Sequence, residues 1–399
     1  MEKIKFNKVF IYLIVFTFFT SINLFAVSDF VVSLKKIIFF ISIFIFMILL
    51  GEIRLKLHIF LITLFLGVIY NFNNLLNGHF NSTIMLVLFS NIFFLDLLLE
   101  FLKKKKLKFF FIKSWVYIAA FSSILGLLQL FNFIPQISDN VLGIYSESYR
   151  NVFNLRDSFQ RGTGLMLDPN FFSIYLIIGL IFNRFHIKNN ILEIVIVIGI
   201  ISTLSRMAFL FLFVFYILTL SKKSFQNYLW LIPLFLLFSF FIPDPIKDYI
   251  VIRFLDLRNI FDFSTITSAT DSSATSRIIT LFSSFEIIQS NIISGVGYGN
   301  VRSAFEAILG YDNVTHNTFI ELIVISGILG VFPIFFIFYY LYKLFLMGND
   351  SVIISIVFFI SFMLLSIISD ILFLFPLFLY NLLNLDDEIF SHSMHDESK

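Results

Sequence analysis

The sequence predicts an all-α integral membrane protein, with about 12 transmembrane helices and a long outer loop between spans nine and ten. Hydrophobic residues make up 59% of the 399 residues and charged residues only 14%, whereas a soluble domain has about a quarter charged. The chain has no Cys, so disulfides and thiolate metal sites are excluded. Its formal net charge of +2 gives no reason to expect a nucleic-acid partner.

The spans follow from apolar runs of about 20 residues, the length needed to cross the hydrocarbon core. The first resembles a signal peptide but lacks a small-residue cleavage site, so we expect it to remain as a helix. Spans seven and eight are short, and because no Gly or Pro marks a turn at Ser205-Arg206, one long helix is the alternative. We expect spans near 9–27, 32–51, 57–76, 83–102, 109–134, 169–183, 190–204, 207–220, 228–243, 317–342, 351–369 and 370–385.

Basic residues orient these spans. With the N-terminus inside, the inner loops hold nearly all the Lys residues, as the positive-inside rule requires, and Lys35 and Lys36 are the exception. Lys222 and Lys223 fall inside only if spans seven and eight are separate. The resulting parts are a five-span region at 1–134, a first outer loop at 135–168, spans six to nine at 169–243, a long outer loop at 244–315, spans ten to twelve at 316–385 and a cytoplasmic tail at 386–399.

The outer loops carry mainly Arg rather than Lys. A guanidinium group binds phosphate or carboxylate through two parallel hydrogen bonds, so this bias predicts an anionic ligand on the outer face. Ordinary surface Arg in long loops is the alternative. The outer Arg residues are Arg150, Arg156, Arg161, Arg206, Arg253, Arg258, Arg277 and Arg302.

The first candidate site lies where the first outer loop meets span six. Arg161 precedes Asp168 and Pro169, which are typical of a helix N-cap and first helical position. Free N–H groups at a helix start favour an anion, and Gly162 and Gly164 would let the backbone approach a ligand. A capped helix start with a flexible lead is the alternative.

Arg206 is the second candidate, at the outer end of span seven. A charge between two apolar runs is costly unless it lines a polar cavity, which favours a functional role. An Arg that extends to the lipid headgroups is the alternative.

The long outer loop contains three further signals. Residues 275–290 have an amphipathic pattern, with Arg277 in the first turn, and we expect this helix to lie on the outer leaflet or to cover a cavity. Gly295, Gly297 and Gly299 predict a turn with exposed backbone N–H groups, but the Lys-Ser/Thr of a nucleotide-binding loop is missing.

His316 ends this loop at the start of span ten, where its side chain could take a proton from a sugar hydroxyl. Asn317 and Glu321 share one helix face and could orient the His or the acceptor. A His that caps a helix at the interface is the alternative. No metal-ligand pattern is present, and we expect no cofactor.

Together these residues resemble the O-antigen ligase/polymerase (Wzy/WaaL-like) superfamily over about residues 110–345. The resemblance rests on the order of the motifs. They are Arg161-Gly162, Asp168-Pro169-Asn170, Ser205-Arg206, Ser276-Arg277, the glycine series at 295–299, His316-Asn317 with Glu321, and Gly327 with Gly330.

The resemblance implies a glycosyltransferase that takes glycan from undecaprenyl diphosphate at the outer face of the cytoplasmic (inner) membrane. Ligases move the glycan to lipid A core, and polymerases move it onto the next lipid-linked repeat unit. The implied partners are the bilayer, the lipid-linked glycan, a flippase and a chain-length regulator. We expect catalytic roles for His316, Arg206 and Arg161 and substrate-binding roles for Arg277, Asn317, Glu321, Asn170 and Gly297.

The leading hypothesis is therefore a metal-independent, inverting polymerase, in which Arg side chains hold the donor diphosphate and His316 deprotonates the acceptor. A ligase is the nearest alternative. A flippase or exporter of lipid-linked oligosaccharide is the alternative from another class, although the spans show neither inverted repeats nor two matched broken helices. Convergence of Arg161, Arg206 and His316 at one outer site would favour the enzyme.

Overall fold

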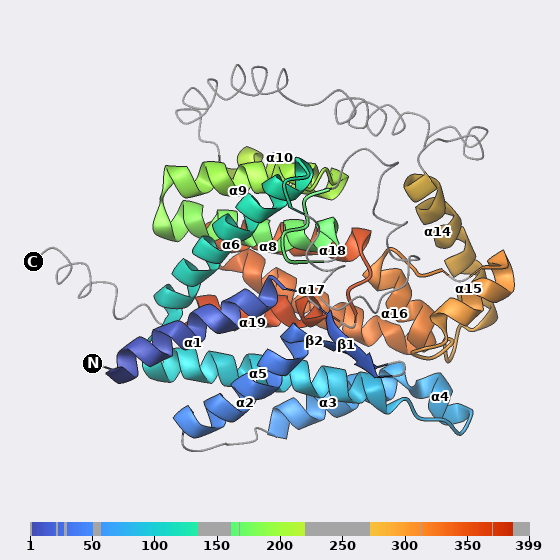
Figure 1. Cartoon of the computed structure of the whole chain (residues 1–399). Coiled ribbons are helices and arrows are strands. Elements are labelled where there is room, and N and C mark those ends of the chain that lie inside the picture. The colour runs from blue at the N-terminus through green and yellow to red at the C-terminus, as the bar shows by residue number, and fades with distance from the viewer. Residues whose placement is uncertain are drawn as a thin grey trace, which may run out of the picture.

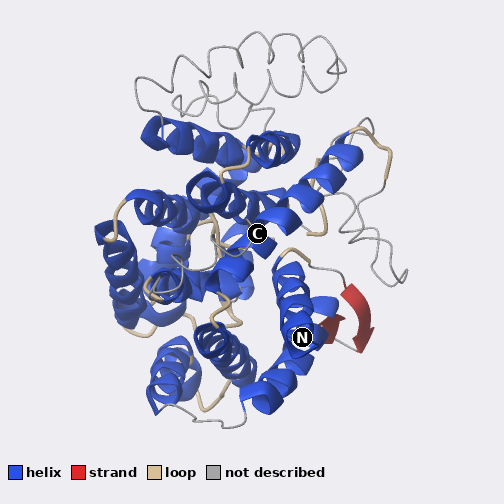
Figure 2. Cartoon of the chain, turned by 90° about the vertical axis from the view of Figure 1, so that its left-hand side faces the viewer, coloured by secondary structure: helices blue, strands red, loops and turns tan. Residues whose placement is uncertain are grey.

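The computed structural model describes residues 2–20, 23–27, 30–50, 57–134, 161–166, 168–219, 272–311, 313–368 and 370–385 (Figure 1). These residues form helices apart from one antiparallel hairpin, so the all-α class is confirmed in the described part of the chain. Figure 2 shows the helices as a bundle with the hairpin at its side. The predicted ninth span at 228–243, most of both outer loops and the tail at 386–399 lie outside the described residues.

The helices follow the predicted spans in order. The N-terminal region has α1 (Glu2–Phe18), β1 (Asn23–Val27), β2 (Phe30–Ser33), α2 (Leu34–Leu50), α3 (Leu57–Tyr70), α4 (Phe72–Leu76), α5 (Ser82–Lys105) and α6 (Lys108–Leu130). The middle has α8 (Pro169–Phe182), η2 (Asn183–Ile187), α9 (Asn190–Ser202) and α10 (Arg206–Thr219). The rest has α14 (Ser272–Ser290), α15 (Val301–Leu309), α16 (Thr318–Ser326), η4 (Gly327–Gly330), α17 (Val331–Leu346), α18 (Asn349–Leu364), η5 (Ile371–Leu374) and α19 (Phe375–Leu383).

Four of these helical stretches are long and apolar enough to cross a membrane: Ser82–Lys105, Lys108–Leu130, Pro169–Ile187 and Thr318–Leu346. The other apolar helices have 10–17 residues. The predicted number of about 12 spans is therefore not confirmed. The first span was placed too far along the chain, because α1 ends at Phe18 and Asn23–Val27 pairs with Phe30–Ser33 as a hairpin. Hydrophobicity alone does not separate a short strand from the end of a helix.

Spans seven and eight are two helices, as the Lys distribution predicted. Between them, Leu204 adopts a φ of 47°, in the left-handed region that few non-glycine residues enter. The chain reverses at this residue, and α10 packs back against α9. The turn has no Gly or Pro signal because a Leu supplies the unusual backbone angle.

One end of the bundle gathers the segments that carry the inner-loop Lys residues. Lys108, at the start of α6, donates to the carbonyls of Leu383 and Leu385 at 2.9 Å each. The start of α6 also lies near the end of α8, because the rings of Trp115 and Phe182 are 6.2 Å apart. We call this the lysine end and define it by Lys108, Arg184, His186 and Asp350.

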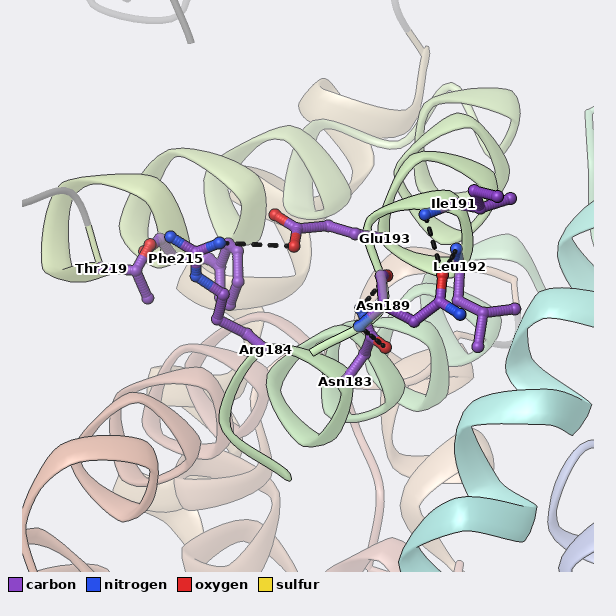
Figure 3. A network of polar contacts seen from close by, with 8 residues as sticks. All are labelled: Asn183, Arg184, Asn189, Ile191, Leu192, Glu193, Phe215 and Thr219. Atoms are coloured by element: carbon purple, nitrogen blue, oxygen red, sulfur yellow. Dashed lines mark hydrogen bonds and ion pairs between the residues drawn. The ribbon is translucent and has the colours of Figure 1, made fainter. Parts of the chain in front are cut away.

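Two ion pairs join helices at the lysine end. Arg184 pairs with Glu193 at 3.5 Å, within the polar network drawn in Figure 3. His186 Nε2 lies 3.0 Å from Asp350 Oδ2, which joins the end of η2 to the start of α18. Because α18 also packs against α8, the two helices run antiparallel. The C-terminal end of α18 therefore lies at the same end of the bundle as the start of α8.

Candidate functional site

Arg161 lies on a short segment, 161–166, that runs against the C-terminal end of α9. Its Nε donates to the carbonyl of Thr203 at 2.9 Å, and the amide of Gly162 donates to the carbonyl of Ser202 at 2.9 Å. The Arg161 residue is only 8% exposed. This contact could not be predicted from local sequence patterns, because Arg161 and Thr203 are 42 residues apart.

Gly162 allows this close packing. A Cβ atom at Gly162 would lie 2.6 Å from the carbonyl oxygen of Gly126 in α6 and 2.4 Å from Ser202 Oγ. A Cβ atom at Gly164, which has a φ of +59°, would lie 2.8 Å from the Phe172 ring. In the structure these glycines bring the backbone close to α6, α8 and α9, whereas we had expected them to bring it close to a ligand.

Asp168 and Pro169 start α8 as predicted. The Asp168 carboxylate accepts hydrogen bonds from the amides of Asn170 at 2.6 Å and Phe171 at 3.4 Å. The protein's own carboxylate therefore occupies N–H groups that we had expected to attract an anion. An anionic ligand at this place would therefore have to be bound by side chains rather than by these N–H groups.

Arg206 is the first residue of α10, directly after the Leu204 turn, and is partly exposed. Next to it, Ser205 Oγ donates to Asn170 Oδ1 at 2.6 Å, which fixes the turn on the start of α8. The helix dipole disfavours a cation at a helix N-terminus by about 0.3–1 kcal/mol, so this position is not explained by helix stability. Arg161 contacts Thr203, so the structure brings both predicted Arg residues to the 203–206 turn.

His316 lies in the segment just before α16 and is brought together with Arg277 of α14. Burial, and to a smaller extent the positive charge of Arg277, together lower the pKa of His316 to about 4. The imidazole is therefore neutral near pH 7 and can accept a proton.

Asn317 and Glu321 attach the start of α16 to the chain that follows α18. Asn317 is the N-cap, accepting from the amides of Phe319 at 2.9 Å and Ile320 at 3.1 Å. Its Nδ2 donates to the carbonyl of Met363 at 3.0 Å. Ser366 Oγ donates to the Glu321 carboxylate. In the described structure both predicted substrate-binding side chains thus contact the protein itself, and their proposed role in binding remains a prediction.

Two clusters of predicted site residues, Arg161 with Arg206 and His316 with Arg277, lie at the same end of the bundle. The helix α18 packs against α8, α10 and α16, and its C-terminal end is opposite the lysine end. The 203–206 turn lies at the start of α8, and His316 and Asn317 lie against the end of α18. We call this end the arginine end, defined by Arg161, Arg206 and His316.

In the glycine series at 295–299, the amides of residues 295–298 are hydrogen-bonded within the protein. Val296, Gly297 and Tyr298 donate their N–H groups to the carbonyls of Val324, Ile325 and Tyr70 at 2.8, 2.8 and 3.0 Å. A Cβ atom at Gly297, which has a φ of +83°, would lie 2.4 Å from Asn74 Oδ1. The expected turn is present, but these three amides are not exposed to a ligand, because they join the loop to α3 and α16.

The predicted amphipathic helix at 275–290 is present as α14. Thr280 and Ser284 are each 1% exposed, whereas Phe282 is 56% and Phe285 is 51% exposed. The hydroxyl groups thus face the protein and the aromatic rings face outward. An outward apolar face is what contact with the outer leaflet requires.

Sequence reasoning missed Gln129 and Ser366, each of which contacts a predicted site segment or residue. Gln129 could have been found as the one amide side chain in the apolar last turns of α6. Among the described residues, no three His, Asp or Glu side chains are grouped so as to hold a metal ion.

Residues 191–335 match the family model Wzy_C, described as O-antigen ligase. The matched region includes Arg206, Arg277 and His316, and begins after Arg161. Comparison with curated proteins finds no significant match. Residues 191–335 therefore match the O-antigen ligase domain of the Wzy/WaaL family, whose members are membrane glycosyltransferases of the ligase/polymerase class, and the apolar helices of the chain fit a multi-pass membrane protein.

Proposed function

We propose that the protein is a polysaccharide polymerase that acts at the outer face of the cytoplasmic membrane. It would move glycan from undecaprenyl diphosphate onto a lipid-linked repeat unit. The observation that carries this proposal is the placement of both clusters at the arginine end, with Arg161 and Arg206 at one turn and His316 beside Arg277.

The reaction is a single displacement without a metal. The acceptor oxygen bonds to the anomeric carbon as the bond from that carbon to the diphosphate oxygen breaks, which inverts the configuration. The acceptor proton passes to His316. Arg161 and Arg206 bind the donor diphosphate and stabilise the negative charge that develops on it.

Donor binding would also strengthen the base. In the free protein, burial and Arg277 keep the pKa of His316 near 4, so the imidazole is neutral but weakly basic. A diphosphate beside Arg277 would offset the positive charge and raise the pKa of His316 towards its ordinary value. The base would then be strongest when the donor is in place.

A ligase that transfers glycan to lipid A core is the second candidate, and the description of the matching family favours it. A flippase of lipid-linked oligosaccharide is the candidate from another class. The polysaccharide profile of a deletion strain separates the three. Single-repeat glycans indicate a polymerase, free lipid-linked polymer indicates a ligase, and repeat units retained on the cytoplasmic side indicate a flippase.

The proposed partners follow from this reaction. The donor and acceptor are lipid-linked glycans, and a flippase must supply them at the outer face. A chain-length regulator would be the remaining partner of a polymerase.

A further inference from the structure

Gln129, in the last turns of α6, holds the segment that follows Arg161. Its Oε1 accepts hydrogen bonds from the amides of Thr163 at 2.9 Å and Gly164 at 2.8 Å. Its Nε2 donates to the carbonyl of Gly164 at 2.8 Å. The Gln129 side chain is fully buried, with 0% exposure. We call these three bonds the Gln129 bracket.

The bracket explains why α6 carries a buried amide. An amide placed in an apolar interior is costly unless its polar atoms are hydrogen-bonded, and here both the oxygen and the nitrogen have backbone partners. The same bonds satisfy backbone groups of a segment that is neither helix nor part of a named strand. Gln129 therefore supplies residues 163–164 with the backbone hydrogen bonds that a neighbouring strand would otherwise supply.

The position of Arg161 is set on two sides. On one side, its Nε and the Gly162 amide donate to Thr203 and Ser202 at the end of α9. On the other side, the bracket fixes the backbone two residues further along. A shift of 163–164 would move Arg161 with it, relative to Arg206 on the next helix.

We propose that Gln129 is a positioning residue of the donor site, which acts through Arg161. The proposal rests on the proposed role of Arg161 in binding the diphosphate. A guanidinium group that binds phosphate through two hydrogen bonds depends on its geometry. A misplacement of about 1 Å at an active site can lower the reaction rate about 10²-fold.

The protein contains a matched control at the lysine end (Figure 3). Asn183 is also a buried amide that holds backbone: its Nδ2 donates to the Asn189 carbonyl at 2.9 Å, and its Oδ1 accepts from the Asn189 amide at 3.3 Å. Removing either amide should lower thermal stability. Only removal of Gln129 should weaken donor binding, because Asn183 lies at the opposite end from Arg161.

The experiment measures the Kd of the full-length protein in nanodiscs for undecaprenyl diphosphate. Gln129→Met keeps the side-chain volume and should raise the Kd about tenfold. Asn183→Leu should leave the Kd unchanged. Gln129→Met combined with Arg161→Lys should bind no more weakly than Arg161→Lys alone, because the two residues act as one unit.

Three results would overturn the inference: a wild-type Kd for Gln129→Met, equal weakening by Asn183→Leu, or additive losses in the double variant. If Gln129→Met does not fold, Gln129→Glu keeps an oxygen that can accept from the Thr163 and Gly164 amides but replaces the donating Nε2 with an oxygen that faces the Gly164 carbonyl, so its Kd should rise measurably; a wild-type Kd would again refute the role. A wild-type Kd for Arg161→Lys would instead refute the proposed donor site itself.

Discussion

Arg161 is a largely buried side chain that the protein holds in a fixed orientation, and its role in binding the donor diphosphate is a proposal. Its Nε is engaged by the Thr203 carbonyl, which orients the planar guanidinium. Lys carries the same charge but lacks the planar group and the second donor direction. Charge alone would therefore not restore the site.

The first prediction concerns Arg161→Lys and Arg206→Lys. Each should lower the transfer rate by about 10²-fold or more, because a donor to the developing charge is lost. Polymer length on gels and the rate with purified protein provide the measurement, and an immunoblot of the membrane fraction controls for protein amount. Arg302→Lys, at an exposed position on α15, is the matched control that should keep wild-type activity. Normal polymer in Arg161→Lys or Arg206→Lys would exclude that residue from the site.

The second prediction concerns His316. His316→Ala should lower the rate by about 10² to 10⁴-fold, the usual contribution of a general base, while undecaprenyl diphosphate still binds. Since the neutral imidazole is the working form and its pKa is about 4, kcat/KM should stay level as pH falls from 8 and drop only near pH 4. The pH profile of kcat, which reports the donor complex, should drop at a higher pH.

The opposite pH dependence of the rate would contradict the assignment of His316 as the general base. If His316 acted as a cation that binds the diphosphate, activity would fall as pH rises, and His316→Arg would restore part of it. Either observation would leave the anion site standing and remove the general base.

At the scale of helices, the arginine end depends on close backbone contacts between α6, the 161–166 segment and α9. Gly162 is one of these contacts, and a Cβ atom there would meet Gly126 and Ser202. Helix packing here therefore sets the position of a functional side chain, since Arg161 immediately precedes Gly162.

The third prediction follows from that contact. Gly162→Ala should destabilise the protein by about 1–3 kcal/mol, because an overpacked side chain must displace backbone. Gly67→Ala is the control, since the atoms nearest its new Cβ belong to the flexible side chain of Met85. The thermal unfolding temperature in detergent should fall more for Gly162→Ala, and equal shifts would contradict the packing argument.

The order of the helices could be predicted from the sequence because long apolar runs and Lys placement are local signals. Three features could not. The Leu204 turn has no Gly, and the hairpin after α1 is as apolar as a span. The amides of 296–298 donate to carbonyls far away in sequence, such as that of Tyr70. Single-sequence patterns carry no information on such distant pairs.

The candidate site was predictable residue by residue but not as a set of contacts. Arg206 and His316 are conspicuous because each is a polar group at the border of an apolar run. That Arg277 lies beside His316, and that Ser205 bonds to Asn170, depends on how separate helices pack. The helix cap at Asp168 could be predicted from the sequence because a cap depends on the residues next to it in the chain.

For the whole molecule, the fourth prediction tests orientation. The lysine end should face the cytoplasm and the arginine end the outside, in line with the positive-inside rule. Because the chain has no Cys, single cysteines can be introduced at the exposed positions Ser290 and Lys188. Ser290→Cys should react with a membrane-impermeant maleimide in intact cells, and Lys188→Cys only after permeabilisation. The reverse pattern would invert the proposed topology.

The Gln129 bracket and the Asn74 contact with Gly297 also bear on how such proteins can recombine. The region matching the O-antigen ligase family starts at residue 191, yet Gln129 and Asn74 lie well before it. A hybrid that joined this region to the N-terminal helices of a relative would keep Arg206 and His316 but would replace Arg161, Gln129 and Asn74. Such a hybrid would therefore fold correctly at both places only if its N-terminal helices carried compatible amides there.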